Sequence, residues 1–144
     1  MKTTLLLLIL GLLVAALPAH AQRSALVIYG GANQTTYLGC LTCIRFDPES
    51  VCRAGGRYGA HLSPQSIWNR NGAYGGQFSP YSPWNRFAKS PPVVLDKAGN
   101  RYGLFWVNTP QRYRADIRRL LETMNNPDDF AATLLEAQEE FCQE

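Results

Sequence analysis

Histidine is scarce in this chain of 144 residues, which contains only His20 and His61. His20 falls in an N-terminal segment that we expect to be removed, so the mature protein keeps a single histidine. One histidine excludes metal sites built on two imidazole ligands, and a serine or cysteine nucleophile would have to use His61 as its base. His61 lies in a glycine-rich stretch and corresponds to Gln77 in an internal repeat, which favours an ordinary polar loop position.

Nucleotide-binding motifs are also missing, because the chain contains neither a P-loop nor a dinucleotide-binding fingerprint. We therefore predict that the protein uses no cofactor. Carboxylates are few before the C-terminal segment, and hydrolysis by a carboxylate pair would need two of Asp47, Glu49 and Asp96. Asp47 is better explained as a helix cap and Asp96 as a turn residue, so the sequence favours a non-catalytic protein. A small hydrolase of envelope polymers is the alternative.

Long apolar runs are confined to the start of the chain. The apolar stretch Leu5–Leu17 follows Lys2 and precedes Ala19-His20-Ala21. A basic start, a short apolar core and an A-x-A ending predict a secretory signal peptide over residues 1–21. The stretch is shorter than the about 20 residues that a membrane-spanning helix needs, and we predict no transmembrane segment. Residues 22–144 are expected to form a single domain in the periplasm or outside the cell.

Acidic residues are rare in the first part of the mature chain and concentrated at its end. Residues 22–121 contain 13 Lys and Arg against four acids, whereas residues 122–144 contain seven acids and no base. Either the acidic end folds back onto the basic body, or the body presents a basic face to an anionic glycan, nucleic acid or lipid headgroup. The arginines are mostly spread along the sequence, so we expect no nucleic-acid partner.

The middle of the chain contains a sequence repeat with a period of sixteen residues, the separation between Ser63 and Ser79. Ser-Pro-x-Ser-x-Trp-Asn-Arg occurs at Ser63–Arg70 and again at Ser79–Arg86, and Phe46–Cys52 aligns with both copies. Each unit places an apolar residue before Asp or Ser and then Pro, an order that caps and starts a helical turn. Nearby glycines end that turn, so we predict three turn and loop modules over residues 46–61, 62–77 and 78–88.

Each module offers one large apolar anchor, which is Cys52, Trp68 or Trp84. A module of this size cannot bury its anchor alone, so neighbouring modules have to stack or share a core. Core packing is the favoured role of the two tryptophans, a disulfide is expected to replace aromatic burial at Cys52, and Asn69 and Asn85 are expected to close turns. Alternatively, Trp68, Asn69, Trp84 and Asn85 form an exposed platform that binds sugar rings.

Two β-hairpins and two helices are predicted around the modules. Residues 25–29 and 36–41 flank a Gly/Asn cluster, and residues 93–95 and 101–107 flank a second turn, which together predict a small antiparallel sheet of four strands. A helical tail is expected over residues 109–142, with one helix opening at Thr109-Pro110 and another at Asn126–Asp129. The predicted apolar stripes are Tyr113, Ile117, Leu120 and Met124, then Phe130, Leu134, Ala137 and Phe141. The predicted fold class is therefore α+β.

The mature chain has four cysteines, Cys40, Cys43, Cys52 and Cys142, and an even number in an exported protein favours disulfides. On a continuing strand Cys40 and Cys43 point to opposite faces, so we predict the pairs Cys43–Cys52 and Cys40–Cys142. Two alternatives use the same residues. The C-x-x-C spacing at 40–43 is that of thiol oxidoreductases, although here it follows a strand instead of opening a helix. Four thiolates would also suffice for a zinc site.

Several motifs occur in a fixed order: Tyr37–Cys43, Ser66–Asn69 with Tyr74-Gly75, Ser82–Ala88, and Pro91–Asp96 followed by Gly99 and Tyr102-Gly103. Together they resemble a group of small, often exported bacterial proteins without an assigned activity, over about residues 36–108. The resemblance implies a bacterial origin and no particular mechanism. We therefore predict a non-catalytic binding or structural module of the bacterial cell envelope, with an envelope glycan or another envelope protein as its partner.

Overall fold

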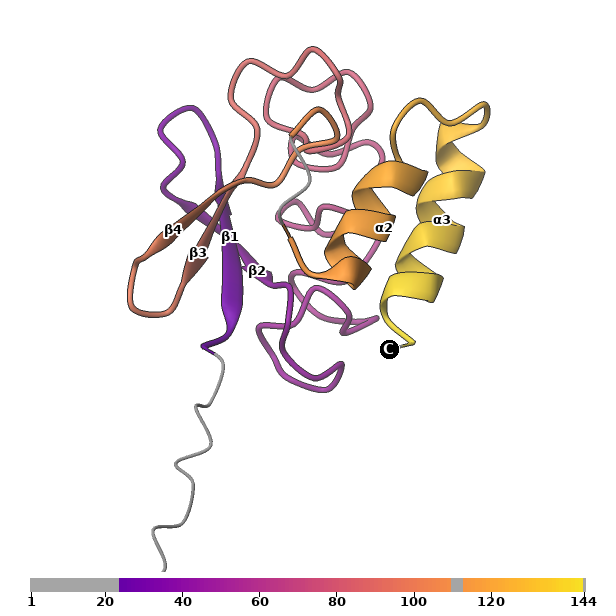
Figure 1. Ribbon diagram of the computed structural model, residues 1–144. Helices are drawn as coiled ribbons and strands as arrows, with labels where there is room; N and C mark the ends of the chain where they lie inside the picture. Colours follow the sequence, from indigo (N-terminus) through magenta and orange to yellow (C-terminus); the bar gives the residue numbers. More distant parts are fainter. Residues whose placement is uncertain (1–23, 110–112, 144) are drawn as a thin grey trace, which may run out of the picture.

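The computed structural model describes residues 24–109 and 113–143, so the predicted signal peptide lies outside the described residues. Figure 1 shows a sheet on one side of the molecule, two helices on the other, and a coiled segment between them. This is the predicted α+β class. The elements in chain order are β1 (Leu26–Gly30), β2 (Thr36–Cys40), β3 (Val93–Asp96), β4 (Arg101–Leu104), α2 (Ala115–Thr123) and α3 (Phe130–Phe141).

The predicted four-stranded antiparallel sheet is confirmed, with the strand order β2-β1-β3-β4. Each hairpin pairs its own strands, and the hairpins join through β1 and β3, where Ile28 lies opposite Val94. Both of these side chains are fully buried. β-Branched residues favour such positions because they pack well on a pleated surface.

Between β2 and β3, residues 44–88 form consecutive tight turns. The backbone N–H groups of Ser50, Arg53, Gly56, Ala60 and Ser63 bond in succession to the carbonyls of Asp47, Ser50, Arg53, Gly56 and Ala60. These five turns, from Asp47 to Ser63, make up one complete coil. The same five turns recur from Ser63 to Ser79. The backbone hydrogen bonds of these turns therefore recur with the period of the sequence.

Both ends of the coiled segment are bonded to residues that border the sheet. At one end Cys40, the last residue of β2, bridges to Ser50, and its N–H donates to the Glu49 carbonyl at 2.7 Å. At the other end the Val107 N–H donates to the Pro83 carbonyl at 3.1 Å. Residues 105–107 therefore leave the sheet to close the coil, which explains why β4 ends at Leu104 and not at the predicted Val107.

Glycine is required at one equivalent position in each of the two complete coils. A Cβ atom on Gly59 would lie 2.2 Å from the carbonyl oxygen of Arg53, and one on Gly75 would lie 2.4 Å from that of Asn69. Both separations are far below van der Waals contact, and the opposing atoms belong to the backbone, which cannot rotate away. The recurring Tyr-Gly pairs at 58–59 and 74–75 thus allow the coil to close upon itself.

The helices α2 and α3 cover the side of the coiled segment away from the sheet, as Figure 1 shows. The two predicted stripes are confirmed, because their members are either buried or packed against the core. α3 begins at Phe130, directly after the predicted start at Asn126–Asp129, and Asp129 caps it by accepting a hydrogen bond from the Ala132 N–H at 3.1 Å. α2 begins at Ala115, later than predicted, and Pro110 lies outside the described residues.

The acidic C-terminal segment folds back onto the body of the protein, which was one of the two interpretations of the charge pattern. The Gln138 side chain donates to the Gly59 carbonyl at 2.8 Å, in a buried hydrogen bond between α3 and the first coil. Glu140 of α3 pairs with Arg119 of α2 at 3.5 Å. Both partners of this ion pair are about half exposed, so it contributes little stability.

Candidate functional site

Trp68 and Trp84 lie inside the molecule, where they expose 1% and 2% of their surface. Their rings are stacked with centroids 5.7 Å apart, and each indole N–H donates to a carbonyl of the preceding coil. The acceptors are the carbonyls of Val51 and Ile67, both at 2.7 Å. The two tryptophans are therefore core residues, as favoured above, and the alternative of an exposed aromatic platform is wrong.

Asn69 and Asn85 close turns, as predicted. The Asn69 side-chain oxygen accepts from the Asn71 N–H at 3.2 Å, and its amide group donates to the Ser63 carbonyl at 3.1 Å. Asn85 makes the equivalent bonds with Phe87 and Ser79, both at 2.9 Å. Asn69 and Asn85 expose only 8% and 9% of their surface, so closing the turns accounts for both side chains.

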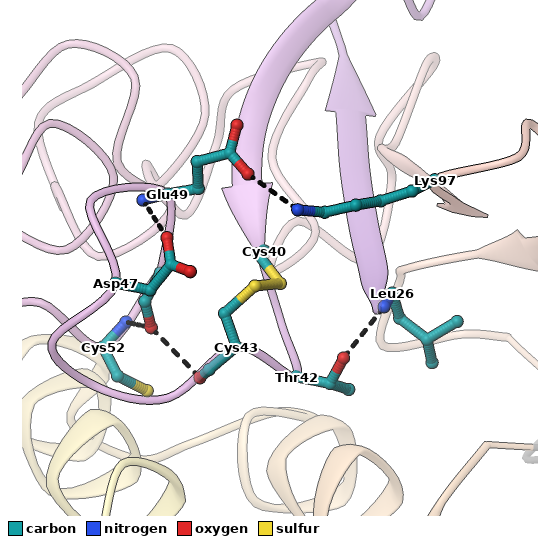
Figure 2. Close-up of a disulfide and its surroundings, with 9 residues drawn as sticks. Leu26, Cys40, Thr42, Cys43, Asp47, Glu49, Cys52 and Lys97 are labelled. Carbon is teal, nitrogen blue, oxygen red and sulfur yellow. Dashed lines mark hydrogen bonds and ion pairs between the residues drawn. A yellow bond between two sulfur atoms is a disulfide. The ribbon is translucent and has the colours of Figure 1, made fainter. Parts of the chain in front are cut away.

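The cysteines pair as Cys40–Cys43 and Cys52–Cys142, so the predicted pairs Cys43–Cys52 and Cys40–Cys142 are wrong. The prediction assumed that the strand continues through Cys43, but β2 ends at Cys40 and the chain turns at once. The turn is held by the Leu26 N–H, which donates to the Thr42 hydroxyl at 2.8 Å (Figure 2). It brings the Cα atoms of Cys40 and Cys43 to 5.5 Å. Since all four sulfurs form disulfides, they do not form the alternative zinc site.

The Cys52–Cys142 disulfide links the first coil to the C-terminal end of α3. Cys52 occupies the position that tryptophan holds in the next two coils, so a disulfide does replace aromatic burial there, as predicted. Next to it, the ring of Phe141 packs against Trp68 with centroids 6.3 Å apart. Cys43, Cys52 and Cys142 line one groove of about 440 Å³, with Phe46 at its border. Both disulfides therefore line the same surface groove.

Three large apolar side chains at equivalent positions of the coil are exposed to solvent. The exposed fractions are 76% for Phe46, 87% for Leu62 and 87% for Phe78, and we call these three residues the apolar ladder. They are spaced by one full coil, so we infer that they lie on successive coils along one side of the coiled segment. Exposed apolar patches of this kind usually mark an interaction surface. Sequence analysis found an apolar residue at this position in every unit but did not identify it as exposed.

An arginine lies near each member of the apolar ladder. The Arg45 guanidinium carbon is 5.5 Å from the centroid of the Phe46 ring. Arg57 hydrogen-bonds to Gln65, and its carbonyl accepts from the Ser63 hydroxyl, immediately after Leu62. Arg70 and Phe78 line the same open hollow of about 530 Å³. The surface around the apolar ladder is thus both apolar and basic.

The carboxylates considered for hydrolysis have structural roles. Asp47 accepts a hydrogen bond from the Glu49 N–H at 2.8 Å, and Glu49 pairs with Lys97 at 3.2 Å (Figure 2). Glu49 and Asp96 do line one hollow of about 300 Å³. Asp96, however, holds the β3–β4 turn by accepting hydrogen bonds from Asn100, Ala98 and Tyr102, and those from Asn100 above all lower its pKa. A carboxyl group with a lowered pKa is a poor general acid, and both oxygens of Asp96 already accept hydrogen bonds within the turn.

Two tyrosines, Tyr37 and Tyr113, have a raised pKa. Burial, followed by the charge of Glu49, raises the pKa of Tyr37 above its usual range. Burial likewise raises the pKa of Tyr113 to about 12, and the Tyr113 hydroxyl donates to the Leu104 carbonyl at 2.6 Å. A phenol with a raised pKa stays protonated at neutral pH and is a weak nucleophile. Tyr113 therefore acts as a hydrogen-bonding group, whereas Tyr37 packs against Tyr29 and Tyr58 with ring centroids 5.2 Å and 5.1 Å apart.

We expect Asp96→Asn to lower the free energy of unfolding at neutral pH and to remove part of its acid dependence. The Asp96 pKa lies below its ordinary value of 3.8 in the folded protein, so the charged form favours folding. In the wild type, the stabilisation of the folded state by the Asp96 carboxylate is complete above about pH 5. It is lost as the pH falls through the lower pKa that Asp96 has in the folded protein. Urea unfolding curves recorded from neutral to acid pH measure both effects. Identical pH dependence in the two proteins would contradict this account.

Within residues 24–109 and 113–143, no cluster of three or more His, Cys, Asp or Glu side chains is placed to hold a metal ion. Over that same part of the chain, neither helix has the length and apolar character to cross a bilayer.

Comparison with known proteins gives no match for this chain among family models, curated proteins or solved structures. Its function therefore has to be inferred from its own geometry.

Proposed function

We propose that the protein is an exported, non-catalytic binding module of the bacterial cell envelope, and that it binds its partner through the apolar ladder. The observation that carries the proposal is the exposure of Phe46, Leu62 and Phe78, each by more than three quarters. Fully burying one such side chain is worth about 1.5–3 kcal/mol, so three exposed together offer substantial binding free energy. Isolated exposed apolar residues are common, but a set that repeats with the coil is not explained by chance.

Other properties support an envelope location. The two disulfides are compatible with an oxidising compartment, where such bonds persist. The predicted signal peptide and the resemblance to small exported bacterial proteins point to the same compartment. The candidate catalytic groups instead serve the fold: Asp47 and Asp96 bond to backbone N–H groups, and Glu49 forms an ion pair.

The proposal is tested by replacing the apolar ladder. We expect the triple variant Phe46→Ser, Leu62→Ser and Phe78→Ser to stay folded and to lose at least about tenfold in affinity for the envelope fraction that retains the wild type. Co-sedimentation with isolated membranes and with peptidoglycan identifies that fraction. Leu135→Ser is the matched control, because Leu135 is an apolar residue of α3 with 53% exposure. Wild-type protein that sediments with neither fraction, or a triple variant that binds equally well, would refute the proposal.

A second candidate, thiol–disulfide exchange, is favoured by one observation. Cys40 and Cys43 of the C-x-x-C motif are bonded to each other, and Cys43 borders the groove. Against it, the motif follows β2 and does not open a helix whose N-terminus would stabilise a thiolate. Titration in glutathione buffers decides between the two. Reduction of the Cys40–Cys43 bond under conditions that leave Cys52–Cys142 intact would favour exchange chemistry, and resistance of both bonds would leave the binding role.

A further inference from the structure

The apolar ladder lacks the features of a site for a small rigid ligand. Its members protrude from the coiled segment, and the hollow beside Phe78 is open. Sites for sugars and other small molecules are concave and place several polar groups around the ligand. Leu62, in the middle of the apolar ladder, has no aromatic face for stacking on a sugar ring. Protruding aliphatic and aromatic side chains instead fit a deformable apolar partner.

The charges around the apolar ladder are mostly positive. Arg45 and Arg114 border the groove at Phe46, and the one carboxylate among the described residues of that groove, Asp116, is paired with Arg114 at 2.8 Å. Among the described residues that line the hollow beside Phe78, Arg70 alone is charged. Arg57 adds a cation near Leu62. An apolar strip flanked by arginines is complementary to a surface whose headgroups are anionic and whose interior is hydrocarbon.

We propose that the apolar ladder inserts into the interface of an anionic phospholipid bilayer, with Arg45 and Arg70 at the headgroups. This inference rests on the proposed binding role and names its partner. Apolar insertion supplies affinity for any fluid bilayer, whereas the arginines supply the preference for negative headgroups. The acidic residues of the C-terminal segment would oppose binding through α3, which favours an orientation in which the coiled segment meets the lipid.

The test measures binding of the chain that begins at Gln22, which includes every described residue and omits the apolar N-terminal stretch. The probes are vesicles of phosphatidylcholine alone and vesicles of equal parts phosphatidylcholine and phosphatidylglycerol. We expect binding to the anionic vesicles to weaken at high salt. The triple serine variant should lose at least about tenfold in affinity for them, whereas Leu135→Ser should bind as the wild type does.

A charge variant separates the two contributions. Arg45→Gln with Arg70→Gln should lose about fivefold per arginine on anionic vesicles and keep the weak binding to phosphatidylcholine. Lys97→Gln is its control, because that lysine lies on the β3–β4 turn and is paired with Glu49.

Three outcomes would overturn the lipid assignment. Wild-type protein that binds peptidoglycan but neither kind of vesicle would refute the lipid partner and leave the binding role standing. A concentration-dependent dimer that the triple serine variant abolishes, without vesicle binding, would assign the apolar ladder to a second copy of the chain. Absence of binding to vesicles, peptidoglycan and a second copy alike would refute both the inference and the proposed function.

Discussion

Replacing Trp68 by alanine is expected to lower the free energy of unfolding by about 3–5 kcal/mol, the usual cost of emptying a large aromatic site in a core. Trp68 exposes 1% of its surface and packs against both Trp84 and Phe141. Its removal also leaves the buried Val51 carbonyl without the indole donor. Chemical unfolding followed by circular dichroism measures this loss of stability. A loss that large is expected to leave the variant unfolded at physiological temperature.

Two control variants separate the contributions of Trp68. Trp68→Phe keeps most of the apolar volume but removes the N–H group. Because the Val51 carbonyl then loses this donor, the free energy of unfolding should fall by about 1–3 kcal/mol. Phe78→Ala removes a large aromatic residue that is 87% exposed, and it should change stability by no more than about 0.5 kcal/mol. A Trp68→Ala protein as stable as Phe78→Ala would show that the tryptophan is not part of the core.

Removing the Cys52–Cys142 disulfide is the second change with a large expected effect. The bond joins residues 90 positions apart, and in the chain-entropy model a loop of this length contributes about 4.6 kcal/mol. We therefore expect the double variant Cys52→Ala and Cys142→Ala to lose about 3–5 kcal/mol, close to the whole stability of a small domain. Thermal unfolding of the wild type and the variant measures the loss.

The other disulfide provides the comparison. Cys40–Cys43 joins residues three positions apart, for which the same model gives only about 1.9 kcal/mol. The variant Cys40→Ala and Cys43→Ala should therefore be the more stable of the two. The reverse order would mean that Cys40–Cys43 stabilises the native turn more than the chain-entropy model allows, or that α3 stays docked without its covalent link.

The parts of the fold that could be predicted from sequence depend on local patterns. The Gly/Asn cluster between β1 and β2, the turn at Asp96–Asn100 and the helical spacing of Leu134, Ala137 and Phe141 each act over a few neighbouring residues. The burial of Trp68 and Trp84 followed from the period, because a single coil of this length cannot enclose an indole by itself.

The disulfide pairing could not be predicted, because it depends on where a strand stops. Between Leu38 and Thr42, Gly39 with its φ of +113° is a local sign that the strand is disturbed, but it does not mark Cys40 as the last residue of β2. The hydrogen bond from Leu26 to Thr42, which turns the chain there, joins residues far apart in the sequence. If the strand had continued, Cys43 would have faced away from Cys40, as the alternation of side chains in a strand requires.

The apolar ladder was missed because its sequence context imitates a buried position. Leu62 precedes Ser63-Pro64, and Ile67 follows at the spacing at which the two residues flanking a helix start pack together. In the structure the segment makes separate turns that close at Ser66 and Asn69 and does not continue as a helix. Ile67 is consequently buried while Leu62 faces solvent. The polar neighbours His61 and Gln77 were the one available sign that this corner faces water.

The attachment of both ends of the coiled segment has a consequence for how the protein can change in evolution. Its first coil is bonded to Cys40 and its last to Val107, and both attachment points border one sheet of four strands. Duplicating one repeat unit would preserve every turn but would force these attachment points apart. The sheet therefore limits the number of units, and homologues with a longer coiled segment would need an additional strand or a looser closing loop.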